Sequence, residues 1–482
     1  MKNTVAIEPG TFERERHFYP RVLNAQIHPL VQYFMKLNNN QIAERYCHMH
    51  PNVNRDAVHQ ALSHTPRYFR WGGSDLFHAT TEQGERRIVV IETNSCPSGQ
   101  KSMPVSLDSP EEAGYRKLLE RAFVPQLNKR GLPKGGLAVL YDKNEMEASG
   151  YAATLAELTG ETVYLVPFYD KSEKNIEPLA RFTKGVLEIK TSNEDEEWLP
   201  IRAALRYVTQ RPWNRIPPLA RTLIFNPIVI CLAGGRNKML AAKAYDLYNA
   251  QLHESGLAIH VPETIWDTAK QEVPIWVQRM GGIAVVKVPY SNAGQGVYTI
   301  TNEQELQAFM DVEATYDRFI VQGLVGNSGW SSQTSRGRLY HIGTVPNRRQ
   351  AIYAADLRFM IGAGQDGFFP VALYSRRARA PLAPNLASGK SSWEMLGTNL
   401  SVQLPDGSWT TEPERLLLMD QRDFNRLGIG LDDLIEGYLQ SVLAVTAIDE
   451  MAQRLISKKK TFRRRLFRSL NPDQALLDEI CK

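Results

Sequence analysis

The stretch from residue 282 to 300 places a lysine and several small residues where they could bind an anion. Lys287 lies within an apolar run at 282–288, and a second apolar run follows at 297–300. The two runs predict strands. The loop between them contains Ser291, Gly294 and Gly296. Glycines let backbone N–H groups approach an anion closely, and the lysine adds a point charge. The stretch therefore predicts a flap over the phosphates of a nucleotide. An ordinary hairpin with a solvent-directed lysine is the alternative.

Composition narrows the class of protein that could carry such a flap. The chain has 482 residues, 43% of them hydrophobic and 23% charged, which predicts a globular protein of two to four domains. It lacks an N-terminal signal pattern and any apolar stretch long enough to span a bilayer, so we expect a cytoplasmic protein. Its formal charge of +5 is small for this length, which favours anionic small substrates over nucleic acid. Four scattered cysteines form no zinc or disulfide pattern: Cys47, Cys96, Cys231 and Cys481.

The middle of the chain alternates predicted strands and helices. A strand at 136–141, a helix at 145–158 and a strand at 162–166 indicate a parallel sheet covered by helices. The apolar run at 228–232 predicts another strand, which leads to a helix that begins at Lys238. This order predicts a mixed α/β protein.

The flanking regions have different patterns. Residues 1–65 have helical periodicity, and residues 74–92 predict a β-hairpin. We expect an edge strand at 256–264 and a buried strand at 318–325. A long antiparallel region follows, with its strongest strands at 353–361 and 368–375, and the last 50 residues are predicted to be helical. A basic run at 458–468 favours a solvated helix face over contact with a membrane or polyanion.

Several of these features follow one another in a recognisable order. They are the Glu92-x-Asn94 pair, Lys238 at a helix start, the Lys287 flap, the strand ending at Gln322 to Val325, and Asp356-Leu-Arg358. This order resembles the ATP-grasp superfamily in its circularly permuted form. It is similar to that of glutathionylspermidine synthetase and related bacterial carboxylate–amine ligases, over roughly residues 70–405. The Glu-x-Asn pair precedes both lysines here, whereas in ordinary members it ends the fold.

The resemblance implies an α/β (α+β) fold, with ATP-grasp in circularly permuted order and a Rossmann-like pre-ATP-grasp domain. The implied parts are an N-terminal helical region plus a hairpin with the metal ligands (1–135), a Rossmann-like α/β domain (136–235), a small lobe with the phosphate flap (236–325), and large-lobe strands with C-terminal helices (326–482).

The resemblance also implies a Mg²⁺ site. Residues two apart on a strand face the same side, so Glu92 and Asn94 can offer oxygen ligands together. In the permuted ligases an aspartate on the preceding hairpin strand completes the set, and Asp75 is the acidic residue placed to do so. Asp356 is a second candidate, which could instead orient Arg358. A turn with an Asx cap is the structural alternative for the Glu92 and Asn94 pair.

The remaining matches concern ATP. Lys238 and Lys287 resemble the two family lysines that neutralise the phosphates. Gln322 and the backbone of 323–325, which includes Leu324 and Val325, resemble the segment that binds the adenine edge. Arg358 resembles the arginine that stabilises charge on the transferred phosphoryl group. Surface lysines and a cross-strand salt bridge between aspartate and arginine are the plain alternatives.

The implied activity is that of an ATP- and Mg²⁺-dependent carboxylate–amine ligase, which forms an acyl phosphate and releases ADP and phosphate. Its substrates would be a small-molecule or peptide carboxylate and an amine. A nucleotide-binding protein without turnover and an ATP-dependent phosphotransferase are the alternatives. Cys96, beside this site in sequence, has no legible histidine partner for nucleophilic catalysis. Some members of an arginine group in the antiparallel region could bind the carboxylate substrate: Arg336, Arg338, Arg348, Arg349, Arg376, Arg377 and Arg379. The sequence identifies neither the substrates nor the oligomeric state.

Overall fold

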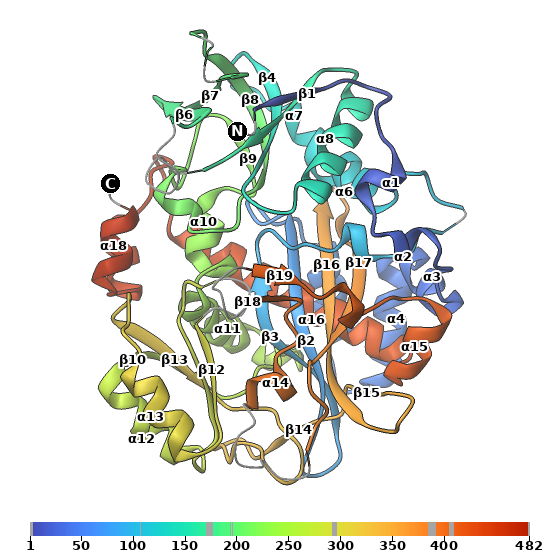
Figure 1. The fold of residues 1–482 in the computed structure, drawn as a ribbon, viewed down its shortest axis with the longest axis vertical. Helices are drawn as coiled ribbons and strands as arrows, with labels where there is room; N and C mark the ends of the chain where they lie inside the picture. The colour runs from blue at the N-terminus through green and yellow to red at the C-terminus, as the bar shows by residue number, and fades with distance from the viewer. Residues whose placement is uncertain are drawn as a thin grey trace.

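A computed structural model describes residues 3–106, 108–169, 177–192, 194, 196–291, 296–383, 392–403 and 409–480. Three main sheets organise the chain (Figure 1). The predicted mixed α/β class is confirmed. The circular permutation, the Rossmann-like character of the middle region and the domain boundaries stay predictions.

The first sheet combines parallel and antiparallel pairing in the order β1-β5-β4-β8-β7-β6, with β9 beside β8. Its parallel strands are β4 (Gly136–Tyr141), β5 (Val163–Pro167), β8 (Leu199–Tyr207) and β9 (Leu223–Phe225). Its antiparallel strands are β1 (Val5–Ile7), β6 (Ala180–Thr183) and β7 (Val186–Ile189). Helix α8 (Glu145–Thr159) joins β4 to β5, as the strand–helix–strand pattern predicted. The carboxyl ends of β4 and β8 therefore share one edge of this sheet.

Two predicted strands are wrong. The apolar run at 228–232 is helical, with α10 (Ile228–Ile230) continuing into a π-helical turn (Cys231–Gly235) before α11 (Lys238–Leu252). A short run of buried apolar residues fits a helix or a strand equally well by pattern, and here tertiary packing decides. The expected edge strand at 256–264 is irregular, and β10 (Thr264–Ala269) begins only where the prediction ended.

The second sheet, which we call the large sheet, is antiparallel throughout and joins distant parts of the chain. The hairpin β2 (Trp71–Thr81) and β3 (Arg86–Asn94) pairs with β16 (Ile352–Gly364), which pairs with β17 (Gly367–Arg377). Its remaining strands are β14 (Leu339–His341), β15 (Thr344–Pro346) and β20 (Leu416–Leu417). The hairpin predicted within 1–135 thus shares a sheet with strands predicted within 326–482.

Side-chain alternation gives the large sheet one apolar and one polar face. Leu76, Leu357 and Phe359 lie on the face covered by α16 (Leu431–Arg454). A Cβ on Gly437 of α16 would lie 3.1 Å from Leu76, so this glycine lets the helix approach closely. Because successive strand residues point to opposite faces, Asp75 and Arg358 must face away from α16.

The third sheet and its two helices form what we call the small lobe. Its order is β10-β13-β11-β12, with β11 (Ala284–Lys287), β12 (Val297–Ile300) and β13 (Arg318–Gln322), all antiparallel. Ala284 and Val286 pack in a core beneath α12 (Val273–Arg279) and α13 (Glu303–Asp311). Alternation then turns Val285 and Lys287 to the other face, towards the large sheet. The strands predicted at 282–288 and 297–300 are confirmed.

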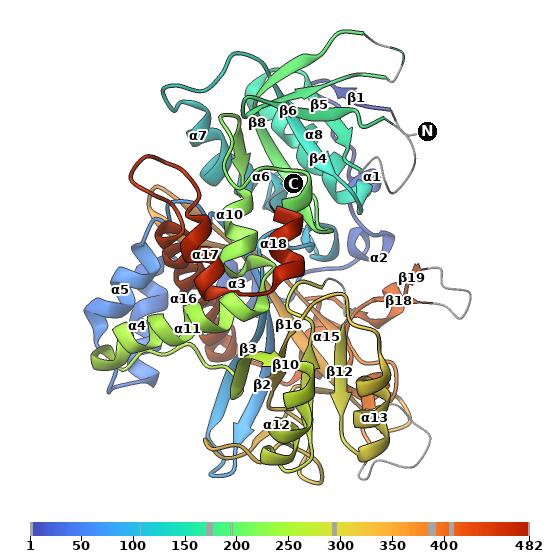
Figure 2. The same cartoon turned by 90° about the vertical axis from the view of Figure 1, so that its left-hand side faces the viewer.

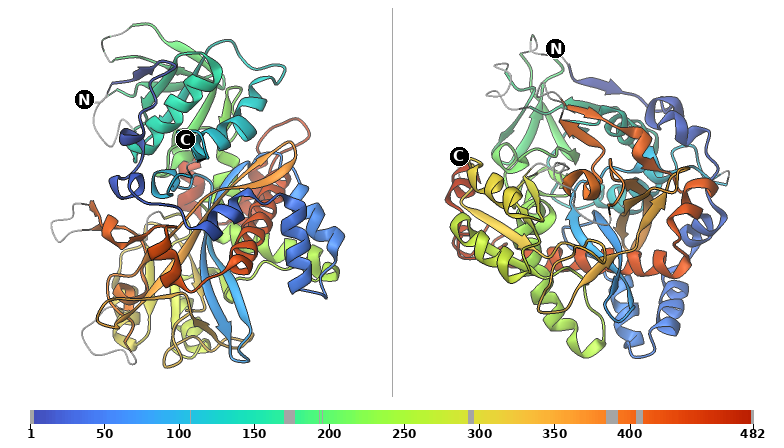
Figure 3. Two further views of the ribbon diagram at one scale, coloured as in Figure 1. Left: turned by 90° about the vertical axis from the view of Figure 1, so that its right-hand side faces the viewer. Right: turned by 60° about the horizontal axis from the view of Figure 1, so that its bottom comes forward.

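Terminal segments pack around these sheets. The N-terminal helices are α1 (Arg14–His17), α2 (Pro20–Leu23), α3 (Pro29–Lys36), α4 (Asn39–Met49) and α5 (Arg55–Ser63). Figure 3 shows α3 to α5 beside α16, and Figure 2 shows α17 (Arg464–Leu470) and α18 (Gln474–Ile480) between the first sheet and the small lobe. The remaining helices are α6 (Gly114–Leu118), α7 (Val124–Leu127), α14 (Ser392–Leu396) and α15 (Gln421–Leu427), and a small hairpin pairs β18 (Ser401–Gln403) with β19 (Trp409–Thr411). Among the described helices, none is both long and apolar enough to cross a membrane.

Candidate functional site

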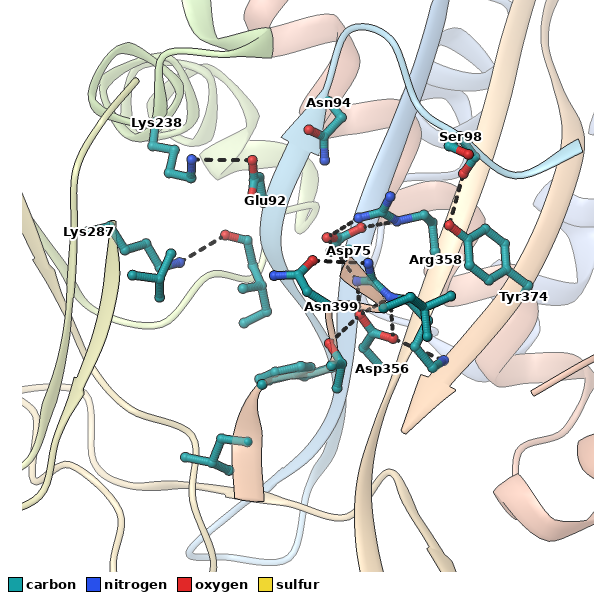
Figure 4. A pocket seen from close by; sticks show the side chains of 18 of the residues that line it. Asp75, Glu92, Asn94, Ser98, Lys238, Lys287, Asp356, Arg358, Tyr374 and Asn399 are labelled. Atoms are coloured by element: carbon teal, nitrogen blue, oxygen red, sulfur yellow. Dashed lines mark hydrogen bonds and ion pairs between the residues drawn. The ribbon is translucent and has the colours of Figure 1, made fainter. Parts of the chain in front are cut away.

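A cavity of about 300 Å³ lies where the polar faces of the large sheet and the small lobe meet the first sheet (Figure 4). Most residues predicted to form the site line it: Asp75, Glu92, Asn94, Lys238, Lys287, Gln322, Leu324, Val325 and Arg358. These residues span almost 300 positions of the sequence. The fold therefore brings the predicted constellation into one place.

Strand register explains how the large sheet gathers its charged side chains. Glu92 of β3 lies opposite Asp75 of β2, Asp75 lies opposite Arg358 of β16, and Arg358 lies opposite Tyr374 of β17. Directly opposed residues of antiparallel strands share a face, so these four side chains form a row across the sheet. The row faces the cavity.

A β-bulge adjusts one end of this row. Asp75 pairs with Glu92, but Leu76 pairs with Val90, so Ile91 is an extra residue in β3. Bulges re-aim side chains and are common beside active sites. Here both Ile91 and Glu92 line the cavity, which regular alternation would prevent.

Four residues of the large sheet form a closed charge cluster, which we call the carboxylate–guanidinium cluster: Asp75, Asp356, Arg358 and Arg376. Arg358 donates Nε–H and Nη2–H to the two oxygens of Asp75, both at 2.5 Å. Arg376 donates to Asp75 at 3.2 Å and forms an ion pair with Asp356. Burial alone would raise the pKa of Asp75, but Arg358 and Arg376 outweigh it and lower this pKa to about 2.

Lys287 is buried in the small lobe with a neutral partner. Its ammonium group donates to Gln322 Oε1 at 2.6 Å and to the Ile91 carbonyl at 3.4 Å. Gln322 in turn donates to Thr264 at 2.8 Å, which fixes the amide. Burial lowers the pKa of Lys287 to about 8, although Glu92 acts in the opposite direction. An anion arriving at Lys287 would therefore meet a desolvated, oriented cation.

Lys238 connects the flap to the large sheet. Asn237 caps α11, so Lys238 occupies the first position of the helix. Its ammonium group donates to the Ser291 carbonyl at 2.9 Å and lies 3.4 Å from a Glu92 oxygen. Lys238 is thus placed between the predicted flap and the predicted metal site.

The flap itself is described only at its base. Val288 N–H donates to the Gly296 carbonyl at 2.7 Å, which closes the loop. Gly296 has φ +64°, and a Cβ there would lie 2.8 Å from Val288, so the position requires glycine. Ser291 and Gly296 line a separate small cavity on the α13 side and not the main one. Gly294 lies outside the described residues.

The segment predicted to bind adenine lines the cavity, but part of its backbone already has partners. Leu324 N–H donates to Ser332 Oγ at 2.7 Å, and the Leu324 carbonyl accepts from Ser332 N–H at 3.1 Å. Gly323 N–H donates to the Glu263 carbonyl at 2.8 Å. Leu324 consequently meets a ligand through its side chain while these bonds persist.

The predicted Mg²⁺ ligands divide into two groups. Both oxygens of Asp75 and both oxygens of Asp356 accept from arginines. Glu92 and Asn94 line the cavity without such bonds to arginine in the described structure. Within the described ranges, no group of three or more His, Cys, Asp or Glu side chains could hold a metal ion. Mg²⁺ commonly uses one or two protein ligands plus phosphates, and Glu92 with Asn94 fits that pattern.

The sequence interpretation missed the loop that follows β3. Tyr374 donates its hydroxyl to the Ser98 carbonyl at 2.9 Å, and Ser98 and Lys101 line the cavity. The buried carboxylate of Glu147 accepts from Ser98 Oγ at 2.7 Å, from Gly99 N–H at 2.9 Å and from Gln100 N–H at 3.0 Å. No periodic signal in the sequence pointed to Lys101.

Two further predictions concern single residue types. Of the arginine group in the antiparallel region, Arg376 lines the cavity and the other members do not. Cys96 also lines the cavity, and burial raises its pKa to about 12, so it is a neutral thiol at physiological pH. This agrees with the expectation that Cys96 is not a nucleophile.

Comparison with known proteins finds only distant similarity. No protein-family model and no curated protein matches the chain. Several solved structures resemble it, and the three described next have TM-scores below 0.5. A RimK domain ATP-grasp protein from Sphaerobacter thermophilus has a TM-score of 0.30 and 14% identity, covering 49% of this chain and 89% of that protein. A glutathione synthetase-like effector from Globodera pallida has 0.37 and 8%, covering 78% and 88%. A D-alanyl-alanine synthetase A from Vibrio cholerae has 0.28 and 13%, covering 50% and 88%.

ATP-grasp, the superfamily that the motifs predicted, is thus represented among the similar structures. All three TM-scores are below 0.5. The proposed function therefore rests on the geometry of the cavity.

Proposed function

We propose that the chain is an ATP- and Mg²⁺-dependent carboxylate–amine ligase of the ATP-grasp type. The observation that carries this proposal is the single cavity in which two lysines, the 322–325 segment, an acidic and amide pair and a buried arginine converge. Phosphoryl transfer needs positioning and charge neutralisation more than a protein nucleophile. The cavity supplies these from three different parts of the fold.

Each residue has a definite task in the proposed reaction. Lys238 and Lys287 neutralise the phosphates of ATP from two sides. Glu92 and Asn94 would hold Mg²⁺, which supplies charge neutralisation between the phosphates. Arg358 stabilises the transferred phosphoryl group, and Asp75 fixes the plane of its guanidinium through two hydrogen bonds.

The bonds made and broken are those of two successive displacements. A carboxylate oxygen of the first substrate attacks the γ-phosphorus, and the bond from that phosphorus to ADP breaks. The nitrogen of the second substrate then attacks the acyl carbon and loses a proton. Phosphate leaves with one oxygen that came from the carboxylate. The products are an amide, ADP and phosphate.

The first test is nucleotide binding followed by thermal unfolding. A ligand that binds only the folded state, at 100 times its dissociation constant, adds about 2.7 kcal/mol of stability. We expect ATP with Mg²⁺ to raise the melting temperature of the wild type, and Lys287→Ala and Glu92→Ala to reduce this shift. Lys36→Ala is the matched control, because Lys36 is an exposed residue of α3. A folded wild type whose melting temperature does not respond to ATP would contradict the proposal.

The second test identifies the reaction. Carboxylate and amine pairs are screened for ADP release, and the product of an active pair is weighed and traced with a heavy-oxygen carboxylate. A ligase gives a condensed product and transfers one labelled oxygen to phosphate. A phosphotransferase instead gives a stable product with an added phosphate. ATP binding without turnover for any pair favours the non-catalytic alternative.

A further inference from the structure

One end of the main cavity is rich in cations that the proposed chemistry does not use. Lys101, Lys143 and Arg236 line it together with Asn144 and Thr209. Lys143 and Asn144 follow the carboxyl end of β4, and Thr209 follows the carboxyl end of β8. Ligands of open α/β sheets bind in the crevice outside the carboxyl ends of the parallel strands. This end of the cavity is therefore a binding region on topological grounds as well.

The loop after β3 ties this end to the reaction centre. Arg236 donates to the Cys96 carbonyl at 3.2 Å, and Ser98 accepts from Tyr374, which lies opposite Arg358 in the sheet. In Figure 4, Ser98 and Tyr374 lie on one side of Arg358, whereas Lys238 and Lys287 lie on the other. A substrate that reaches from Arg358 towards this loop therefore extends away from the nucleotide lysines.

Lys101 is a buried cation at this end of the cavity. Its exposed fraction is only 6%, and its ammonium group donates to Asn144 Oδ1 at 3.0 Å and lies 5.2 Å from the centre of the Tyr19 ring. Both of these partners, Asn144 and Tyr19, are neutral, and no ion pair joins Lys101 to a described acidic residue. A buried charge is costly unless it is compensated. An anionic ligand group would supply that compensation.

The acidic residues of the cavity lining are unevenly distributed. The acidic residues among the described lining are Asp75, Glu92 and Asp356, all on the large sheet. Asp75 and Asp356 are already bonded to Arg358 and Arg376, and Glu92 faces Lys238. No described acidic residue lines the end that contains Lys101 and Arg236.

We propose that the carboxylate substrate carries a second anionic group, a carboxylate or a phosphate ester, which Lys101 and Arg236 hold at this end of the cavity. The inference rests on the proposed ligase function for the identity of the first, reacting carboxylate. It deepens that function by assigning the substrate to the class of acids with at least two negative charges. The amine substrate is excluded from this end by like charge.

Binding of small acids in the absence of ATP tests the inference directly. Glutarate and butyrate have similar carbon chains and differ by one carboxylate, and inorganic phosphate represents the other anionic group. Affinities are measured by calorimetry at constant ionic strength for the wild type, Lys101→Met and Arg236→Gln. Lys36→Met is the matched control, since it removes an exposed charge that is not part of the cavity lining. Lys101→Gln replaces Lys101→Met if the latter does not melt as a folded protein.

We expect glutarate to bind wild type about ten-fold or more tightly than butyrate, as a charge-assisted bond would give. Lys101→Met and Arg236→Gln should remove most of this preference, and Lys36→Met should keep it. Phosphate binding that depends on Lys101, without a preference for glutarate, would support a phosphate ester as the second group. Equal affinity for all three anions, or a preference unaffected by both substitutions, would overturn the inference.

The ATP experiments separate this inference from the ligase proposal. A protein that binds ATP and releases ADP with monocarboxylates alone, and shows no glutarate preference, refutes the second anionic group and leaves the ligase intact. A protein that prefers glutarate through Lys101 but does not bind ATP retains the anion site and loses the ligase.

Discussion

The large sheet and the small lobe each place buried cations in the cavity, but they neutralise them differently. Arg358 and Arg376 of the large sheet face Asp75 and Asp356. Lys287 of the small lobe has the neutral Gln322 as its partner, and burial lowers the pKa of Lys287 to about 8. The sheet cluster is thus complete without a ligand, whereas the lobe has a positive charge that a phosphate can neutralise. The large-sheet cluster thus stabilises itself and orients Arg358, whereas Lys287 keeps a positive charge that a ligand can neutralise.

The largest expected effect comes from breaking the carboxylate–guanidinium cluster. Asp75→Ala leaves Arg358 and Arg376 buried with one carboxylate between them, and removal of one partner of a buried pair costs about 3–5 kcal/mol. Urea unfolding at neutral pH, without nucleotide, measures this loss. A loss below about 1 kcal/mol would show that the cluster is not structural.

The same cluster has a pH dependence with a definite sign. The pKa of Asp75 is lowered from 3.8 to about 2, so its contribution to stability is present above pH 4 and is lost as the pH falls through 2. Acid unfolding of the wild type and of Asp75→Ala should therefore converge below pH 2.

The second effect tests this difference by placing a carboxylate beside Lys287 in the small lobe, as Asp75 lies beside Arg358 in the large sheet. The lowered pKa of Lys287 means that this group binds more protons in the unfolded chain between pH 8 and 10.5, so its contribution to wild-type stability should rise by about 3 kcal/mol over that interval. Gln322→Glu places a carboxylate beside Lys287 and should raise its pKa, which flattens the rise. Urea unfolding across this pH range compares the two proteins, and an unchanged slope in Gln322→Glu would contradict the role of Lys287.

The third effect concerns ATP affinity. Lys287→Met removes a charged donor to phosphate, which costs about 1.5–3 kcal/mol, or roughly ten- to a hundred-fold in affinity. Stability without nucleotide should change by about 1 kcal/mol or less, because the lost bond to Gln322 and the relieved burial of charge offset each other. Calorimetric titration with ATP and Mg²⁺ gives the affinity. Loss of stability without loss of affinity would place Lys287 with the structural residues instead.

The smallest effect is expected for an exposed ion pair, which serves as a reference for the buried ones. Asp108→Ala removes the partner of Lys36 in an ion pair whose side chains are 65% and 59% exposed. Such pairs contribute about 0–1 kcal/mol. Urea unfolding should barely change, and a loss as large as that of Asp75→Ala would mean that burial is not what distinguishes the cluster.

The sequence was most informative where the chemistry lies on regular strands. Lys287 was placed on the correct strand because it lies within a continuous apolar run, and Glu92 and Asn94 were expected to face one way. The pairing of Asp75 with Arg358 depends on the register between β2 and β16, which no local pattern specifies.

Other parts of the site could not be predicted from local sequence patterns, for different reasons. Lys101 lies in a short 3₁₀ turn (Gln100–Ser102), and Glu147 of α8 fixes the start of this turn through Gly99 and Gln100. The bulge at Ile91 appears only once β3 pairs with β2. The run at 228–232 was predicted as a strand because five buried apolar residues fit either state, and its helical form follows from the packing around α11 and α16.

Asp75 and Arg358 are 283 residues apart in the chain, although their side chains are in direct contact. During synthesis the β2–β3 hairpin emerges long before β16, so Asp75 has no arginine partner until most of the protein has been made. Contacts of such long range are formed late, because the intervening loop must first be ordered. The cluster that orients the proposed phosphoryl-binding arginine therefore forms only when folding is nearly complete. A partly synthesised chain would contain Glu92, Asn94 and both lysines but no assembled site.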